Sequence, residues 1–154
     1  MSWFARLIYR ALVWKERQRA RRERSSAAEV RAGASHLKTG ERGETLAYWY
    51  LRQAGYTIVA RNQRARSGGG ELDLVGWDGP VLAFIEVNTR KSEEAGPPEA
   101  AVLRKKQKRI ARAAKEYIRR RGTKPVNYRF DVVSLVWDPD AGYQLRLTKD
   151  AFKA

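Results

Sequence analysis

The sequence predicts one α/β domain in which helices flank a mixed β-sheet. Two observations support this class. Helical and strand-like hydrophobic patterns follow one another in the order α-β-β-β-α-β-β, and the segments between them are rich in Gly, Pro and Asp. The chain has 154 residues, of which 43% are hydrophobic, so it is long enough to bury a core. No internal repeat is visible.

The first helix of this domain is predicted to begin at Thr39 or Gly40 and to end near Ala54, with Gly55 as its C-cap. A second, longer helix is predicted from Pro98 or Glu99 to about Arg121. The Asp78-Gly79 pair followed by Pro80 is typical of a hairpin turn. The apolar run 81–88 predicts a central strand. The predicted strands are residues 56–62, 71–77, 81–88, 128–137 and 143–148.

Residues 1–35 are predicted to form a basic N-terminal extension, and residues 36–154 the α/β domain. The apolar side chains of the extension recur at helical spacing and predict one apolar stripe along a helix. A flexible joint is expected around residues 25–28 and 33–35. Four roles stay open for this extension: docking on its own domain, lying on a membrane surface, binding a protein partner, or contacting nucleic acid. The residues of the stripe are Trp3, Phe4, Leu7, Ile8, Ala11 and Leu12.

The charge balance points to a polyanionic partner. Lys and Arg number 32 against 17 Asp and Glu, which gives a net charge of +15. Nucleic acid is the first expectation and an anionic membrane the second. The chain has no Cys and only His36, so a bound metal would be a hard cation such as Mg²⁺ or Mn²⁺ on carboxylates. No apolar run approaches the roughly 20 residues that span a bilayer, and no signal peptide is visible, so we expect a cytoplasmic protein.

A candidate acidic site lies on the second and third predicted strands. Glu71 and Asp73 alternate along one strand and are expected to share a face, with Leu72 and Leu74 on the other. Glu86 interrupts an otherwise apolar central strand, where a carboxylate is costly to bury. The hairpin would bring Asp73 beside Glu86. A divalent cation between the two would remove their repulsion and activate a bound water.

The segment from GERGETLAYWYL through GGGELDLVGWDGPVLAFIEVNTR to LRKKQKRIARAA resembles the YraN family of bacterial proteins. That family is similar to archaeal Holliday-junction resolvases within the PD-(D/E)xK nuclease superfamily. The resemblance implies a five-stranded, restriction-endonuclease-like core in which Asp73 and Glu86 hold the metal. It also implies assisting roles for Glu44, Glu71 and Gln107, and a homodimer.

One position departs from the family pattern. The family has Glu-Val-Lys-Thr-Arg where this chain has Glu86-Val87-Asn88-Thr89-Arg90. The resemblance implies that the Lys orients the attacking water, and Asn88 brings no charge to that task. Arg90 and Lys91 are the candidates for the missing cation. Two functions therefore stay open: a metal-dependent DNA endonuclease, and a DNA-binding module that is weak or inactive as a catalyst.

The second helix is strongly basic. A solvated helix usually mixes its charges, whereas this one carries almost only Lys and Arg outside its apolar face. Such a surface fits phosphate contacts without base readout, so branched or non-specific DNA is the expected partner, with RNA as the alternative. The predicted nucleic-acid contacts are Arg61, Arg64, Arg66, Arg90, Lys91, Arg104, Lys105, Lys108, Arg109 and Arg112.

Overall fold

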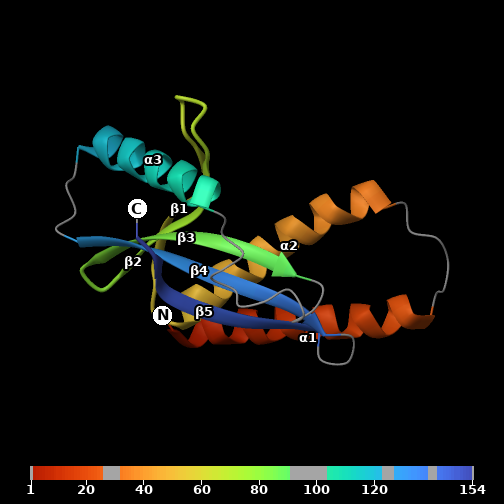
Figure 1. The fold of residues 1–154 in the computed structure, drawn as a ribbon. Helices are drawn as coiled ribbons and strands as arrows, with labels where there is room; N and C mark the ends of the chain where they lie inside the picture. Colours follow the sequence, from red (N-terminus) through yellow and green to blue (C-terminus); the bar gives the residue numbers. More distant parts are fainter. Residues whose placement is uncertain (1, 26–31, 91–103, 123–126, 139–141, 154) are drawn as a thin grey trace.

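The computed structural model describes residues 2–25, 32–90, 104–122, 127–138 and 142–153. It contains three helices and five strands in these ranges (Figure 1). The helices are α1 (Ser2–Ser25), α2 (Ala32–Gln53) and α3 (Arg104–Arg121). The strands are β1 (Thr57–Arg64), β2 (Glu71–Asp78), β3 (Val81–Arg90), β4 (Asn127–Asp138) and β5 (Gly142–Phe152).

The five strands form one sheet in the order β1-β2-β3-β4-β5. All neighbours are antiparallel except β3 and β4, which are parallel because α3 lies between them in the chain. This confirms the predicted element order and mixed sheet. The central position of β3 follows from its apolar sequence, since a strand covered on both faces needs apolar side chains on both.

Helices cover both faces of the sheet, with α3 on one side and α1 with α2 on the other (Figure 1). The core on the α3 side joins Ile110 and Ala114 to Phe84 and Val132 of the sheet. The core on the α2 side is built around residues such as Leu51, which is fully buried. Each helix therefore buries one apolar stripe against one face, as a three-layer α/β domain requires.

The start of α2 differs from its prediction. The helix begins at Ala32, not at Thr39 or Gly40, so the expected joint at residues 33–35 is helical. A glycine lowers helix propensity by only about 1 kcal/mol, so Gly33 and Gly40 do not prevent the helix from extending back to Ala32. Gly43, further along α2, lies close to β3, because a Cβ there would lie 2.6 Å from the Oγ1 of Thr89. The part of the other predicted helix before Arg104, residues 98–103, lies outside the described residues.

Strand β2 also breaks the alternation that its sequence predicts. Leu72 packs in the core on the α3 side and Leu74 in the core on the α2 side, so the expectation that they fill one face is wrong. The break coincides with Asn62 on β1, which adopts a left-handed conformation (φ 48°) between the paired residues Arg61 and Gln63. Asn tolerates this conformation better than most residues do.

Helix α1 does not present the single apolar stripe predicted from the sequence. Trp3, Phe4 and Leu7 are exposed, whereas Leu12 packs against the core on the α2 side together with Val13. The predicted stripe spans about half of the helix circumference, because positions 3 and 12 lie on opposite sides at about 100° per residue. Helix α1 does dock on its own domain, but mainly through residues outside the predicted stripe, such as Ala5 and Val13.

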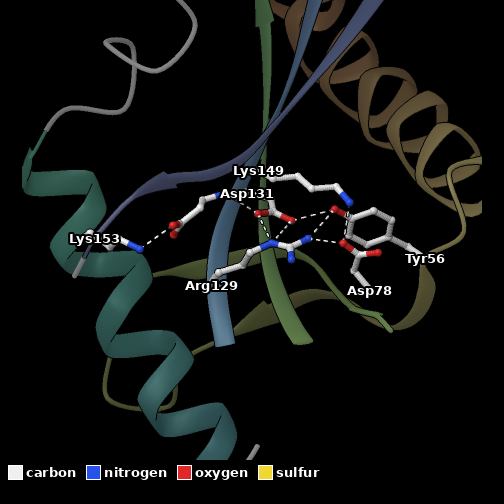
Figure 2. Close-up of polar contacts among 7 residues, drawn as sticks. Tyr56, Asp78, Arg129, Asp131, Lys149 and Lys153 are labelled. Atoms are coloured by element: carbon white, nitrogen blue, oxygen red, sulfur yellow. Dashed lines mark hydrogen bonds and ion pairs between the residues drawn. The ribbon is translucent and has the colours of Figure 1, made fainter. Parts of the chain in front are cut away.

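A polar cluster closes the end of the sheet where β3 and β4 begin (Figure 2). Asp131 is fully buried on β4 and accepts hydrogen bonds from the Tyr56 hydroxyl (2.9 Å) and the Arg129 Nε (2.8 Å). The Arg129 guanidinium also pairs with Asp78, and Lys149 donates to the same carboxylate at 2.6 Å. Because each charge has a partner of opposite sign, the cluster ties together residues from β2, β4 and β5.

Candidate metal and nucleic-acid site

A pocket of about 410 Å³ opens between the β2–β3 hairpin and α3. Acidic side chains from the sheet meet basic side chains from the first turns of the helix. The residues that line it are Gly70, Glu71, Asp73, Glu86, Lys105, Lys106, Arg109 and Ile110. The structure thus brings together three of the acidic residues predicted from the sequence.

The hairpin geometry places Asp73 beside Glu86. The two strands pair from Asp78 with Val81 to Leu74 with Ile85, across a two-residue Gly79-Pro80 turn. One residue further out, Asp73 accepts a hydrogen bond from the backbone N–H of Val87 (2.8 Å). Glu86 is only 4% exposed. The carboxylate pair is therefore held by strand pairing, which the sequence pattern predicted.

Burial changes the acidity of both groups. Desolvation, followed by the charge of Glu86, raises the pKa of Asp73 to about 7. Desolvation also raises the pKa of Glu86, against the opposing influence of Lys106. Glu44 on α2 raises the pKa of both carboxyls through its charge. Because these two carboxyls are hard to ionise, a cation bound between them would strongly stabilise their charged forms.

Lys106 was not among the site residues predicted from the sequence. Its ammonium group pairs with the buried carboxylate of Glu86, although the lysine itself is half exposed. The sequence contains a signal for this contact, because Lys106 lies four residues before the inward-facing Ile110 and therefore on the same side of α3. Among the described residues, this cation reaches the site from the helix, and the prediction for Arg90 or Lys91 stays untested. The side chain of Arg90 and all of Lys91 lie outside the described residues.

Asn88 and Gln107 occupy different surroundings. The Nδ2 atom of Asn88 is buried and has no hydrogen-bond partner among the described residues. Its register neighbour on β4 is Ser134, whose buried Oγ also has none in the part of the chain that the structure describes. The Asn88 amide and the Ser134 hydroxyl, two residues along β3 from Glu86 and on the adjacent strand, can therefore still form hydrogen bonds. Gln107 is half-buried on α3 and is not among the residues that line the pocket.

The donor set fits one kind of metal. Within the described ranges, no three His, Cys, Asp or Glu side chains converge as a complete metal centre. Mg²⁺ is commonly bound through one or two carboxylates, with waters and substrate phosphates filling its other positions. Asp73 and Glu86 suit that pattern and do not suit a closed structural site.

The loop between β1 and β2, residues 65–70, packs along α3 next to the pocket. Glu116 on α3 accepts hydrogen bonds from the backbone N–H of Arg66 (2.7 Å) and from the Ser67 hydroxyl (2.8 Å). These bonds hold the pKa of Glu116 below its usual value. Gly70 lies so close to α3 that a Cβ would sit 3.1 Å from the backbone oxygen of Arg109. The loop between β1 and β2 is thereby fixed along the helix.

The outer surface of α3 is wholly basic. Glu116, the single acidic residue of the helix, is buried and its carboxylate accepts hydrogen bonds from the loop. Arg64 pairs with Glu71 at 3.5 Å near the pocket. Arg61 lies instead over the ring of Tyr48 from α2, 5.0 Å from its centroid, on the other face of the sheet. The exposed cations of the helix are Arg104, Lys105, Lys106, Lys108, Arg109, Arg112, Lys115, Arg119, Arg120 and Arg121.

The fold and the site define an α/β protein with a resolvase-like core, in which the β2–β3 hairpin presents a carboxylate pair of half-buried Asp73 and buried Glu86. The chain belongs to the Uncharacterised protein family UPF0102, which matches residues 43–135. This confirms the resemblance to the YraN family. The match begins within α2, so α1 lies outside it.

Two relatives illustrate the extent of the similarity. A UPF0102 protein of Solibacter usitatus is 52% identical over 97 residues, which cover 63% of this chain and 74% of the relative. The UPF0102 protein STH1475 of Symbiobacterium thermophilum is 46% identical over 117 residues, which cover 76% of this chain and 98% of the relative. Nearly the whole of the second relative therefore aligns with about three quarters of this chain.

Proposed function

We propose that this protein is a metal-dependent endonuclease acting on branched or non-specific DNA. The observation that carries the proposal is the pairing of half-buried Asp73 with buried Glu86, which faces the ammonium of Lys106 in a pocket beside the first turns of a basic helix. Carboxylates that hold Mg²⁺ or Mn²⁺, next to cations that hold a phosphate, are the parts that phosphodiester hydrolysis requires.

In this proposal Asp73 and Glu86 bind the cation, with Glu44 and Glu71 adding negative charge around it. A bound Mg²⁺ or Mn²⁺ would supply Lewis acidity and lower the pKa of a water. Lys106 provides the positive charge that Asn88 lacks, and it reaches the site from α3. Lys105 and Arg109 line the same pocket and would hold the phosphate. The Asn88 amide would orient a water by hydrogen bonding.

The other predicted properties belong to the same proposal. The exposed cations of α3 would follow the DNA backbone, which gives affinity without sequence readout. Cleavage of both strands of a branched substrate would need two sites and therefore a homodimer. A cytoplasmic location follows from a DNA substrate in a bacterial cell. RNA binding is the alternative for the same basic surface.

The test compares two isosteric double variants. Asp73→Asn plus Glu86→Gln should abolish cleavage of branched DNA in Mg²⁺ or Mn²⁺, while DNA binding persists because α3 is unchanged. Glu41→Gln plus Asp150→Asn neutralises two exposed carboxylates outside the pocket and should cleave as the wild type does. Metal-dependent cleavage that survives in the first variant would rule out this site.

Asn88 favours a second candidate, a DNA-binding module on the same scaffold. Loss of a preorganised donor typically lowers catalysis by about 10²–10³. This candidate predicts salt-sensitive DNA binding by the wild type and no hydrolysis in either metal. Cleavage that requires Glu86 would decide against it.

A further inference from the structure

Helix α1 is apolar on two opposite faces, and only one of them packs against the protein. The inward face is covered by the domain: Ala5 is buried, the ring of Tyr9 lies 5.8 Å from that of Tyr50, and Leu12 and Val13 join the core on the α2 side. Further along, the Cγ of Arg17 lies close to Gly142 on β5. The helix is thus fixed in orientation by its inward contacts.

The outward face carries large apolar side chains. Trp3 is 67% exposed, Phe4 65%, Leu7 54% and Trp14 64%. Positions 3, 7 and 14 fall within about 40° of one another on a helical projection, so they form one narrow stripe. An exposed cluster of large apolar side chains of this kind marks an interaction site.

The cations beside the stripe indicate that its partner is anionic. Arg6, Arg10 and Lys15 are exposed beside it. Among residues 3–19, whose side chains are described, the single acidic residue is Glu16, which is half-buried. Pairing two copies through this face would bring cations of the same sign together. An anionic lipid surface instead offers opposite charge to the arginines and an apolar layer to the tryptophans, which favour membrane interfaces.

The position of α1 is compatible with DNA binding elsewhere. The sheet separates α1 from the basic helix α3, so the two surfaces face away from each other (Figure 1). None of the described helices has the length and the apolar character needed to cross a bilayer. From the stripe, the cations beside it and its place in the fold, we infer that α1 binds an anionic membrane surface. The helix axis lies parallel to that surface, and Trp3, Leu7 and Trp14 insert into it.

The test is co-sedimentation of the full chain with vesicles of phosphatidylcholine, with and without phosphatidylglycerol. The wild type should sediment with the anionic vesicles and much less with the neutral ones. Trp3→Gln plus Leu7→Gln plus Trp14→Gln should weaken binding by at least about tenfold, since three apolar side chains lose their burial. These positions point outward, so the variant should keep the circular dichroism and melting temperature of the wild type.

A matched control separates the stripe from net charge. Arg119→Gln plus Arg120→Gln plus Arg121→Gln removes three cations from α3 and should sediment with anionic vesicles nearly as well as the wild type. Three results would overturn the inference: no sedimentation of the folded wild type, equal sedimentation of the α1 variant, or loss of sedimentation in the α3 control. A concentration-dependent dimer that the α1 variant abolishes would assign the stripe to a second copy and would also overturn it.

Discussion

The ammonium group of Lys106 on α3 pairs with the carboxylate of Glu86 on β3, which is 4% exposed. The lysine is half exposed and reaches the buried acid from the pocket mouth. Among the described residues, Lys106 is thus a cation that compensates the charge of Glu86. In the proposed enzyme the same group would turn toward a substrate phosphate.

Replacing Lys106 should separate metal binding from catalysis. Lys106→Met should lower cleavage of branched DNA by about 10²–10³, the typical effect of losing one preorganised charge donor. Mn²⁺ binding, measured by isothermal titration calorimetry, should be unchanged or tighter, because the ammonium and the metal compete for the Glu86 carboxylate. Weaker Mn²⁺ binding together with lost cleavage would mean that Lys106 only supports the fold of the pocket.

Two further variants control this result. Lys108→Met removes a cation of α3 that does not line the pocket, and it should cleave within a few-fold of the wild type. Asn88→Lys, added to Lys106→Met, should recover cleavage, because Asn88 is placed on the face of β3 that carries Glu86. If the double variant cleaves as slowly as Lys106→Met alone, a lysine introduced at position 88 cannot take over the role of Lys106.

Gly70 should not tolerate a side chain. Its φ of 143° favours glycine, and a Cβ would meet the backbone oxygen of Arg109 at 3.1 Å. Gly70→Ala should lower the free energy of unfolding by about 1–3 kcal/mol, as expected for a strained backbone. Gly68→Ala is the matched control, because Gly68 also has a positive φ but has open space around it. Urea denaturation should show the larger loss at Gly70, and equal losses would mean that contact with α3 is unimportant.

The basic surface of α3 should control the salt dependence of DNA binding. Arg109→Gln plus Arg112→Gln should reduce the slope of log Kd against log salt by about 1.8, since each phosphate contact contributes about 0.9 for duplex DNA. Fluorescence anisotropy over a salt series measures this slope. Arg6→Gln plus Arg10→Gln on α1 should leave it unchanged, and an equal effect there would place the DNA on both sides of the molecule.

Lys149 should stabilise the protein at neutral pH and not in acid. Its hydrogen bond, followed by that of Arg129, holds the pKa of Asp78 below the usual value. A carboxylate with a depressed folded-state pKa stabilises the fold above the unfolded-state pKa, about 3.9, and this contribution is lost as the pH falls through the folded-state value. Lys149→Met should cost about 0.2–1 kcal/mol at pH 7, because the lysine is half exposed.

Urea denaturation at neutral and acid pH measures this difference. The gap between wild type and Lys149→Met should close as Asp78 becomes protonated. Lys153→Met, which breaks a more exposed pair with Asp150, should have a smaller effect at neutral pH. A gap for Lys149→Met that stays constant into acid would show that the lysine acts through packing and not through Asp78.

The element order, the central strand and the placement of Asp73 beside Glu86 could all be predicted from the sequence. These features depend on local patterns: hydrophobic periodicity, the Gly79-Pro80 turn and the register counted from it. The sequence did not determine where α2 begins, because local glycines suggested a break, whereas each glycine costs a helix only about 1 kcal/mol.

The sequence places Lys106 on the inward side of α3, but contacts between elements settle that it meets Glu86. Lys106 follows Glu86 by 20 residues, and its approach depends on how α3 packs across the sheet. The same holds for α1, whose apolar residues divide between a buried and an exposed face only when the helix docks on α2 and β5. Periodicity shows which residues share a face of an element, whereas contacts between elements decide what that face touches.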